Sequence, residues 1–303
     1  MGETGFPAPY LGPREVDRLV DPEGLVADIA RILPAAVSPP RVSLTHRGTW
    51  FAAMPAAAED VLAAKLVSLH PRNPSRGLPL VRGLLVLLDA ETGEPLLAAD
   101  AAAATGWRTA AATALALRLL GAPRGAALGV IGAGVQADYH LRVLRRLFSP
   151  SRVLVSSRSR ARARRLALAH GGEVVERRRL LEESDIVVAA TTAEEPVVEG
   201  RLLAWGALVA SVGAPRPVRE LDAETLLRAG CVLADTVEGV MEEAGDVDAS
   251  MVDVVGLRGL LSGGEACRWR EVRAYKSVGT AALDLAVAAH LYRRLRRGGP
   301  APG

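Results

Sequence analysis

Short apolar runs alternate with amphipathic segments through the middle of the chain. Five of these runs have the composition of buried strands, at 128–131, 152–156, 186–190, 207–210 and 231–234. Strands that alternate with helical segments are typical of a doubly wound parallel sheet. We therefore predict an α/β fold whose centre is a Rossmann-type sheet.

The first hundred residues follow a different pattern. We expect two short helices within 13–33, the second starting at Asp21-Pro22, because an Asp cap followed by Pro is a helix-start signal. Period-two patterns and turn residues predict strands at 42–46, 49–54, 63–69, 80–88 and 95–98, and apolar periodicity predicts helices at 105–120 and 277–295. We expect the last helix to return to the first domain. This gives an α+β substrate and dimerisation domain (1–121 with 277–303) split around a dinucleotide-binding domain (122–276).

A glycine-rich turn follows the first strand of the central series. It has the pattern G-x-G-x-x-A, formed by Gly132, Gly134 and Ala137. The first glycine permits a tight turn, the second lets the backbone approach a pyrophosphate, and the small third residue lets the helix pack close to the strand. The N–H groups and positive dipole end of that helix form an anion site. The turn predicts dinucleotide binding.

The end of the second strand indicates which dinucleotide. Sheets that bind NAD usually carry an acidic residue about 20 residues after the glycines, whereas this chain has Ser157, Arg158 and Ser159 there and no acid in reach. The serines can donate to phosphate oxygens, and Arg158 can pair with a 2′-phosphate. We therefore favour NADP(H), with NAD(H) as the alternative if Arg158 only opens the exposed, arginine-rich helix that follows.

Composition excludes several other classes. The net charge of +3 is small and dispersed, and an aromatic content of 4% is too low for stacking platforms, so we expect no nucleic-acid partner. No apolar run reaches the length of a membrane span, so no membrane association is expected. Cys231 and Cys267 suggest neither a disulfide framework nor a metal site, which favours a reducing cytoplasm.

The chain has only two lysines, Lys65 and Lys276, among 37 basic residues. Lys65 lies inside an apolar strand, where a desolvated lysine can act as an acid or base. The alternative is an edge residue whose ammonium reaches water. None of the four tyrosines precedes a lysine in a Tyr-x-x-x-Lys pattern, which excludes the short-chain dehydrogenases.

Several segments, in order and over nearly the full length, resemble the ornithine cyclodeaminase/μ-crystallin family. This family includes archaeal alanine dehydrogenases and bacterial ketimine reductases. The matching segments are Lys65-Leu66-Val67 with His70-Pro71-Arg72-Asn73, Thr105-Gly106-Trp107-Arg108, the glycine turn, Val212-Gly213-Ala214, Arg219-Glu220-Leu221-Asp222, Glu243-Ala244-Gly245-Asp246, and Lys276-Ser277-Val278-Gly279 with Asp284.

The resemblance implies a site and an assembly. The substrate carboxylate would be held by cations at Arg41, Lys65 and Arg108, with Lys65 able to exchange a proton with the substrate nitrogen. The implied cofactor contacts, besides the turn and the serine–arginine segment, are Val135, Gln136, Thr191, Thr192, Val212, Arg219, Ser277 and Val278. The family also implies a homodimer formed through strands of the first domain.

One departure from the family bears on the reaction. Cyclodeaminases carry an aspartate two residues after the glycine of the Val-Gly segment, and here that position is Pro215, which cannot accept a proton. We therefore expect an NAD(P)H-dependent oxidoreductase that reduces the C=N bond of a small α-imino acid. Candidate substrates are a cyclic ketimine such as Δ1-pyrroline-2-carboxylate or, as in alanine dehydrogenase, pyruvate plus ammonia. The alternatives are ornithine cyclodeaminase and a non-catalytic NADPH-dependent binding protein of the μ-crystallin kind.

Overall fold

The fold is described by a computed structural model that covers residues 8–264 and 266–298. The chain divides into two compact units, residues 1–108 with 280–303 and residues 109–279. Helix α3 (Ala101–Leu119) carries the chain from the first unit into the second. The last five residues of the predicted segment 277–303 lie outside the described part.

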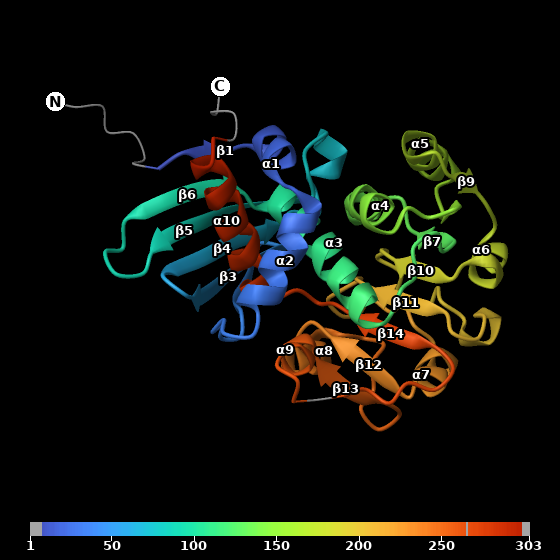
Figure 1. The fold of residues 1–303 in the computed structure, drawn as a ribbon. Helices are drawn as coiled ribbons and strands as arrows, with labels where there is room; N and C mark the ends of the chain where they lie inside the picture. The colour runs from blue at the N-terminus through green and yellow to red at the C-terminus, as the bar shows by residue number, and fades with distance from the viewer. Residues whose placement is uncertain (1–7, 265, 299–303) are drawn as a thin grey trace. The chain divides into compact units, whose positions relative to one another are not determined.

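The first unit is built on a six-stranded sheet with the order β1-β6-β5-β4-β3-β2. Neighbouring strands are antiparallel, except that β1 runs parallel to β6. Helix α10 packs across β3, β4 and β5, α1 packs against β6, and α2 packs against α10 (Figure 1). The elements are β1 (Tyr10–Leu11), α1 (Pro13–Leu19), α2 (Pro22–Ile32), β2 (Val42–His46), β3 (Thr49–Ala58), β4 (Val61–Leu69), η1 (Pro74–Arg76), β5 (Val81–Asp89), β6 (Pro95–Asp100) and α10 (Ala281–Arg296).

The two faces of this sheet differ because side chains alternate along each strand. On β4, Ala63, Lys65 and Val67 lie on the face that α10 covers and are buried, whereas Leu62 and Leu66 lie on the other face and are more than a third exposed. Lys65 therefore belongs to the interior of the first unit, not to a water-exposed edge.

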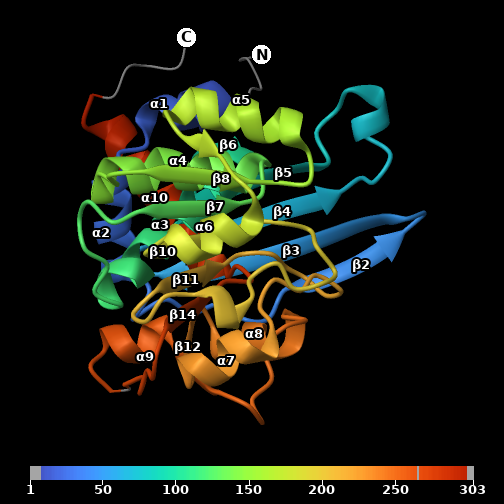
Figure 2. The same ribbon diagram turned by 90° about the vertical axis from the view of Figure 1, so that its right-hand side faces the viewer.

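The second unit is built on an eight-stranded sheet in which every neighbouring pair is parallel, with the order β13-β12-β14-β11-β10-β7-β8-β9. Figure 2 shows β8, β7, β10, β11, β14 and β12 following one another across it. The elements are β7 (Leu128–Ile131), α4 (Val135–Phe148), β8 (Val153–Ser156), α5 (Arg160–His170), β9 (Glu173–Val174), α6 (Arg177–Glu183), β10 (Ile186–Ala189), η2 (Gly200–Leu202), β11 (Leu208–Ser211), α7 (Ala223–Ala229), β12 (Cys231–Ala234), α8 (Val237–Glu243), β13 (Asp253–Gly256), α9 (Leu257–Leu261) and β14 (Arg273–Lys276).

The strand order locates the ligand-binding edge of this unit. The chain winds outward from β7 through β8 to β9 and then returns to place β10 on the other side of β7. In open parallel sheets, ligands bind beyond the carboxyl ends of the strands where the order reverses. That point lies between β7 and β10, and the glycine turn directly follows β7. The α/β class and the doubly wound sheet expected from the sequence are confirmed.

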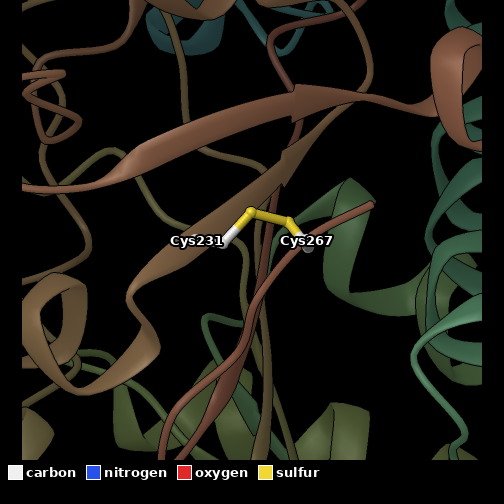
Figure 3. Close-up of a disulfide and its surroundings, with 2 residues drawn as sticks. All are labelled: Cys231 and Cys267. Atoms are coloured by element: carbon white, nitrogen blue, oxygen red, sulfur yellow. A yellow bond between two sulfur atoms is a disulfide. The ribbon is translucent and has the colours of Figure 1, made fainter. Parts of the chain in front are cut away.

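The cysteine prediction is wrong. Cys231, at the start of β12, and Cys267, in the segment before β14, form a disulfide (Figure 3). Their Cα atoms are 5.6 Å apart, within the range that a disulfide requires. The two cysteines are 36 residues apart, and their proximity depends on β14 inserting beside β12, which the apolar pattern does not reveal. The pairing removes the cysteine-based support for a reducing compartment.

No helix in residues 8–264 and 266–298 is long and apolar enough to cross a membrane. Nor does this part of the chain contain a group of three or more His, Cys, Asp or Glu side chains that could hold a metal ion.

Candidate functional site

The glycine turn after β7 contains two glycines with different constraints. Gly132 has φ of +117°, and a Cβ built on it would lie 2.3 Å from the carbonyl oxygen of Ala190, which follows β10. The fold of the second unit therefore requires glycine at 132. Gly134 has the extended backbone of a helix N-cap, with φ −100°, and a Cβ there would meet nothing within 4 Å. Packing within the described part of the chain does not explain glycine at 134, whereas the close approach of a ligand would.

The first turn of α4 has the properties of an anion site. Its N-cap, Gly134, has no side chain to cap the helix, so the first N–H groups remain available. Val135 is 66% exposed, and Gln136 Oε1 is buried without a hydrogen-bond partner in the described part of the chain. These features fit a dinucleotide whose pyrophosphate approaches the turn.

His140 stabilises the first turn of α4 as a neutral side chain. Its Nδ1 donates to the carbonyl of Gln136 at 2.7 Å, and its Nε2 accepts from the Thr113 hydroxyl at 2.9 Å. Burial lowers the pKa of His140 to about 4. The imidazole is therefore neutral at physiological pH and acts as a structural bridge between α3 and α4.

The serine–arginine segment follows β8, as the sequence predicts. Ser159 is the N-cap of α5, where its hydroxyl accepts from Arg162 N at 3.4 Å, and Ser157 Oγ accepts from Ser159 N at 3.4 Å. The Arg158 side chain is exposed, and no carboxylate pairs with it among the residues that the structure describes. Its guanidinium is free to meet an anion that binds beside the end of β8.

Three buried ionisable residues, Glu220, Asp246 and Lys276, form a cluster beside the loops that follow β10 and β11. The Glu220 carboxylate accepts hydrogen bonds from the backbone N–H groups of Thr191 and Gly213 and from the Ser211 hydroxyl, at 2.6, 2.7 and 2.7 Å. Asp246 Oδ2 in turn accepts from the Glu220 N–H at 2.7 Å. This cluster fixes the loops that leave β10 and β11 relative to each other.

Lys276, at the end of β14, completes the cluster. Its ammonium donates to the Ser211 hydroxyl at 2.8 Å and to the Gly213 carbonyl at 2.9 Å, and it pairs with Asp246 at 2.9 Å. Lys276 and Glu220 are fully buried. All donors of the ammonium are used within the protein, so Lys276 positions the loops and does not contact a ligand.

Asp235 fixes the segment that follows β14. Its carboxylate accepts from the Ser277 hydroxyl at 2.7 Å, from Val278 N at 3.3 Å and from Gly279 N at 2.7 Å. The Ser277 hydroxyl therefore already donates within the protein. Its remaining capacity is as an acceptor.

Most of the predicted cofactor residues lie at the carboxyl-terminal edge of the sheet. Thr191 and Thr192 follow β10, Val212 follows β11, and Ser277 and Val278 follow β14. Arg219 lies further along the loop after β11, exposed, with its Nε donating to the carbonyl of Gly245 at 3.0 Å.

The first unit contains a separate cluster of cations. Lys65 of β4 and Arg108 of α3 meet at the carboxylate of Asp284, in the first turn of α10. Lys65 Nζ lies 3.0 and 2.8 Å from the two oxygens of Asp284, and Arg108 Nε lies 3.2 Å from Oδ1. All three side chains are at least nine-tenths buried, and Thr105 accepts from Lys65 at 3.5 Å. We call Arg41, Lys65 and Arg108 the cation cluster.

Opposing influences act on the Lys65 ammonium. Desolvation and the charges of Arg108 and Arg41 lower the pKa of Lys65, whereas Asp284 raises it, and the net result is a pKa of about 8. Arg41, which precedes β2, is thus near enough to Lys65 to affect its titration. Arg108 Nη1 is buried and has no hydrogen-bond partner among the described residues. Lys65 and Arg108 share the single carboxylate of Asp284, and Nη1 keeps a donor, so these two cations can accept another anion.

The structure brings Lys65 and Arg108, which the family resemblance grouped, to one carboxylate, whereas the sequence predictions assigned no role to the acids in these clusters. Asp284, Asp235, Glu220 and Asp246 are all buried. Asp235 follows Ala234, Asp246 follows Gly245, and Glu220 lies between Arg219 and Leu221, so no local pattern marks these three acids as buried. The available signal was the occurrence of Asp284, Glu220 and Asp246 within the segments shared with the family.

In the parallel sheet, β9-β8-β7-β10-β11 follow one another, and a glycine turn with exposed groups around it follows β7. These features define a dinucleotide-binding class of protein. The chain belongs to the ornithine cyclodeaminase/mu-crystallin family, whose model matches residues 24–299.

Individual relatives agree with this assignment. The ketimine reductase mu-crystallin of Mus musculus is 33% identical over 276 residues, which cover 89% of this chain and 85% of the relative. The structure of Thermococcus litoralis Δ1-pyrroline-2-carboxylate reductase in complex with NADH and L-proline matches with a TM-score of 0.86 and 31% identity, covering 95% of this chain and 98% of the other. An archaeal alanine dehydrogenase dimer with bound NAD matches with a TM-score of 0.85 and 26% identity, covering 97% of each chain.

Proposed function

We propose that this protein is an NAD(P)H-dependent oxidoreductase that reduces the C=N bond of a small α-imino acid. The second unit would bind the dinucleotide and the first unit the substrate. The observation that carries the proposal is the cation cluster: two buried cations share one carboxylate, and Arg108 keeps a buried N–H donor without a partner. A substrate carboxylate would pair with the two cations and accept a hydrogen bond from the Arg108 Nη1 group. Relatives that reduce ketimines and pyrroline carboxylate support this choice.

Each residue of the cation cluster has a distinct task. Arg108 would bind the substrate carboxylate through the Nη end of its guanidinium, and Arg41 would bind it from the segment before β2. Lys65 would hold the anionic substrate by its charge and could exchange a proton with the substrate nitrogen, which its lowered pKa of about 8 favours.

The cofactor would occupy the glycine turn and the neighbouring loop ends. Bound NAD(P)H supplies the hydride. The helix N-terminus after Gly134 would bind the pyrophosphate, and the loops fixed by Glu220 and Asp235 would exclude water from the ring. Arg158, exposed and without a carboxylate partner in the described chain, would pair with the 2′-phosphate of NADP(H). We propose NADP(H) as the preferred cofactor on this basis.

The loop after β11 argues against ornithine cyclodeaminase. Pro215 stands at the position of the cyclodeaminase aspartate and is exposed, and proline has no group that accepts a proton. Activating an amine or water at that point would need a base, and no other residue of that Gly213–Pro217 segment supplies one.

A substrate panel tests the reaction. NADPH oxidation is followed with Δ1-pyrroline-2-carboxylate, Δ1-piperideine-2-carboxylate, and pyruvate with ammonia or methylamine, while a parallel sample receives ornithine and catalytic NAD. The proposal expects turnover of at least one imino acid. Proline and ammonia from ornithine would show a cyclodeaminase instead. Tight NADPH binding without any turnover would support a binding protein of the μ-crystallin kind.

We also propose that the protein forms a homodimer through the uncovered face of the first unit's sheet. The strand register aligns apolar residues across that face, with Leu44 opposite Phe51 and Ala53 opposite Leu66, and Val42 is 72% exposed. A contiguous apolar patch of this kind marks an interaction surface, and a structurally similar alanine dehydrogenase is a dimer.

Light scattering after gel filtration tests the dimer. Leu66→Glu should convert the protein to monomer, because it places a charge in the apolar patch. Leu168→Glu, at an 86%-exposed position of α5, is the matched control and should leave the mass unchanged. A wild-type monomer, or a dimer in Leu66→Glu, would contradict the proposal.

A further inference from the structure

Asp284 is a buried carboxylate whose side chain holds two cations from two other elements. It lies in the first turn of α10, which Thr280 caps through a 3.4 Å hydrogen bond to Ala282 N. An acid in the first turn favours a helix by itself, but that role needs no burial. Asp284 is only 1% exposed, and its carboxylate contacts Lys65 of β4 and Arg108 of α3.

The contact with Arg108 leaves a defined part of the guanidinium for a ligand. Asp284 accepts from Nε at 3.2 Å. Nη1, at the far end of the guanidinium, is buried and unpartnered within residues 8–264 and 266–298. A planar guanidinium held through Nε cannot turn that edge toward a ligand, so a second carboxylate must approach from the Nη end.

The contact with Lys65 sets the charge that a ligand meets. The groups that act on the Lys65 ammonium are Arg108 from α3, Arg41 from the segment before β2 and Asp284 from α10. Two of these are cations that disfavour the charged lysine, and desolvation acts in the same direction. Among the residues that the structure describes, Asp284 is the charged group that opposes these effects, so the ammonium depends on its carboxylate.

We propose that Asp284 is the positioning residue of the cation cluster: it fixes the Nε edge of Arg108 and keeps Lys65 charged, so that both cations meet the substrate carboxylate in one arrangement. This inference rests on the proposed function, in which the cluster binds an α-imino acid. Asp284 itself does not contact the substrate.

The two-lysine composition makes a direct test possible. Protein labelled with ¹³C at lysine Cε gives two side-chain signals, and Lys65→Arg identifies the signal of Lys65. The wild-type signal should titrate near pH 8. In Asp284→Asn the midpoint should fall by about 1–3 pH units, because the opposite charge is lost while the isosteric amide keeps the packing.

Ligand binding provides a second readout. The affinity for Δ1-pyrroline-2-carboxylate, measured by calorimetry at pH 7 with saturating NADPH, should fall about tenfold or more in Asp284→Asn. Asp284→Glu should recover part of it. Asp28→Asn is the matched control, since Asp28 pairs with His290 and Arg293 in the same unit and does not contact the cluster. It should leave the affinity and the Lys65 midpoint unchanged.

The outcomes separate the two proposals. A wild-type protein that binds no carboxylate contradicts the proposed function, whereas the lysine titration needs no substrate and still reports on Asp284. Unchanged midpoint and unchanged affinity in Asp284→Asn would overturn the positioning role. If Asp284→Asn does not fold, the same two measurements on Asp284→Ala, which also removes the carboxylate, decide: a Lys65 midpoint and affinity equal to those of the wild type would overturn it.

Discussion

The two glycines of the turn after β7 should respond in opposite ways to the same substitution. Gly134→Ala adds a methyl group at a backbone conformation that any residue adopts, where nothing lies within 4 Å. Alanine is a poorer N-cap than glycine, which lowers the free energy of unfolding. It also reduces the conformational entropy of the unfolded chain, which raises the free energy of unfolding by about 0.4–1 kcal/mol. The free energy of unfolding should therefore change by less than about 1 kcal/mol.

Cofactor binding should change much more. If the pyrophosphate approaches the backbone at Gly134, the new methyl group occupies its position, and the dissociation constant of NADPH should rise at least about tenfold, or about 1.4 kcal/mol. The measurement is a titration of NADPH fluorescence, with thermal unfolding of the same samples.

Gly132→Ala is the matched control. Its Cβ would lie 2.3 Å from the backbone oxygen of Ala190 at φ of +117°, a strain of about 3 kcal/mol or more. This variant should lose stability first and binding as a consequence. A Gly134→Ala protein that binds NADPH like the wild type would refute the placement of the pyrophosphate at this turn.

Four further outcomes follow from the structure. Arg158→Ala should raise the KM for NADPH about 10- to 100-fold and leave that for NADH unchanged; an unchanged preference in steady-state kinetics would remove Arg158 from the cofactor site. Carboxylate affinity should fall as the pH rises through about 8, where Lys65 loses its charge, and a flat calorimetric profile from pH 7 to 9 would contradict this. His140 binds a proton near pH 6.5 in the unfolded chain and only near pH 4 in the folded chain. The free energy of unfolding, measured with urea, should therefore fall by about 3 kcal/mol as the pH is lowered from 6.5 to 4. A His140→Gln variant should lose less stability over the same pH range. Cys267→Ser opens a bridge between residues 36 apart and should cost about 4 kcal/mol; equal denaturant midpoints with the wild type would show that the bridge is not formed.

The sequence was sufficient for the elements that have strong patterns. The strand at 42–46 has the predicted bounds, and the helix predicted at 105–120 is α3, which starts four residues earlier, at Ala101. Asp21 caps α2 as its position before Pro22 indicates, with its side chain accepting from Gly24 N at 2.9 Å.

The hydrophobic pattern does not predict strands whose polar residues are buried in pairs. Strand β14 lies between β11 and β12 but begins with Arg273 and ends with Lys276. A four-residue strand with charged ends gives no apolar run, and its burial depends on Asp246, 30 residues earlier in the chain. The disulfide depends on the same strand.

Asp284 and Asp246 could not be predicted either, because each is far in the sequence from the lysine that it pairs with. Lys65 is recognisable because it interrupts an apolar strand, but its partner Asp284 is 219 residues away and has the appearance of an ordinary first-turn acid of a helix. Only tertiary structure brings the two together, so composition and periodicity could indicate the cation but not the carboxylate that positions it.

The requirement for a substrate carboxylate can be measured by comparing Δ1-pyrroline-2-carboxylate with Δ1-pyrroline, which has the same C=N bond and no carboxylate. Single-turnover oxidation of bound NADPH should be at least about 100-fold faster with the carboxylated imine, because two charge-assisted hydrogen bonds contribute about 3 kcal/mol or more. Arg108→Lys should reduce this ratio. Equal rates for the two imines would contradict the role of the cation cluster in binding an α-imino acid.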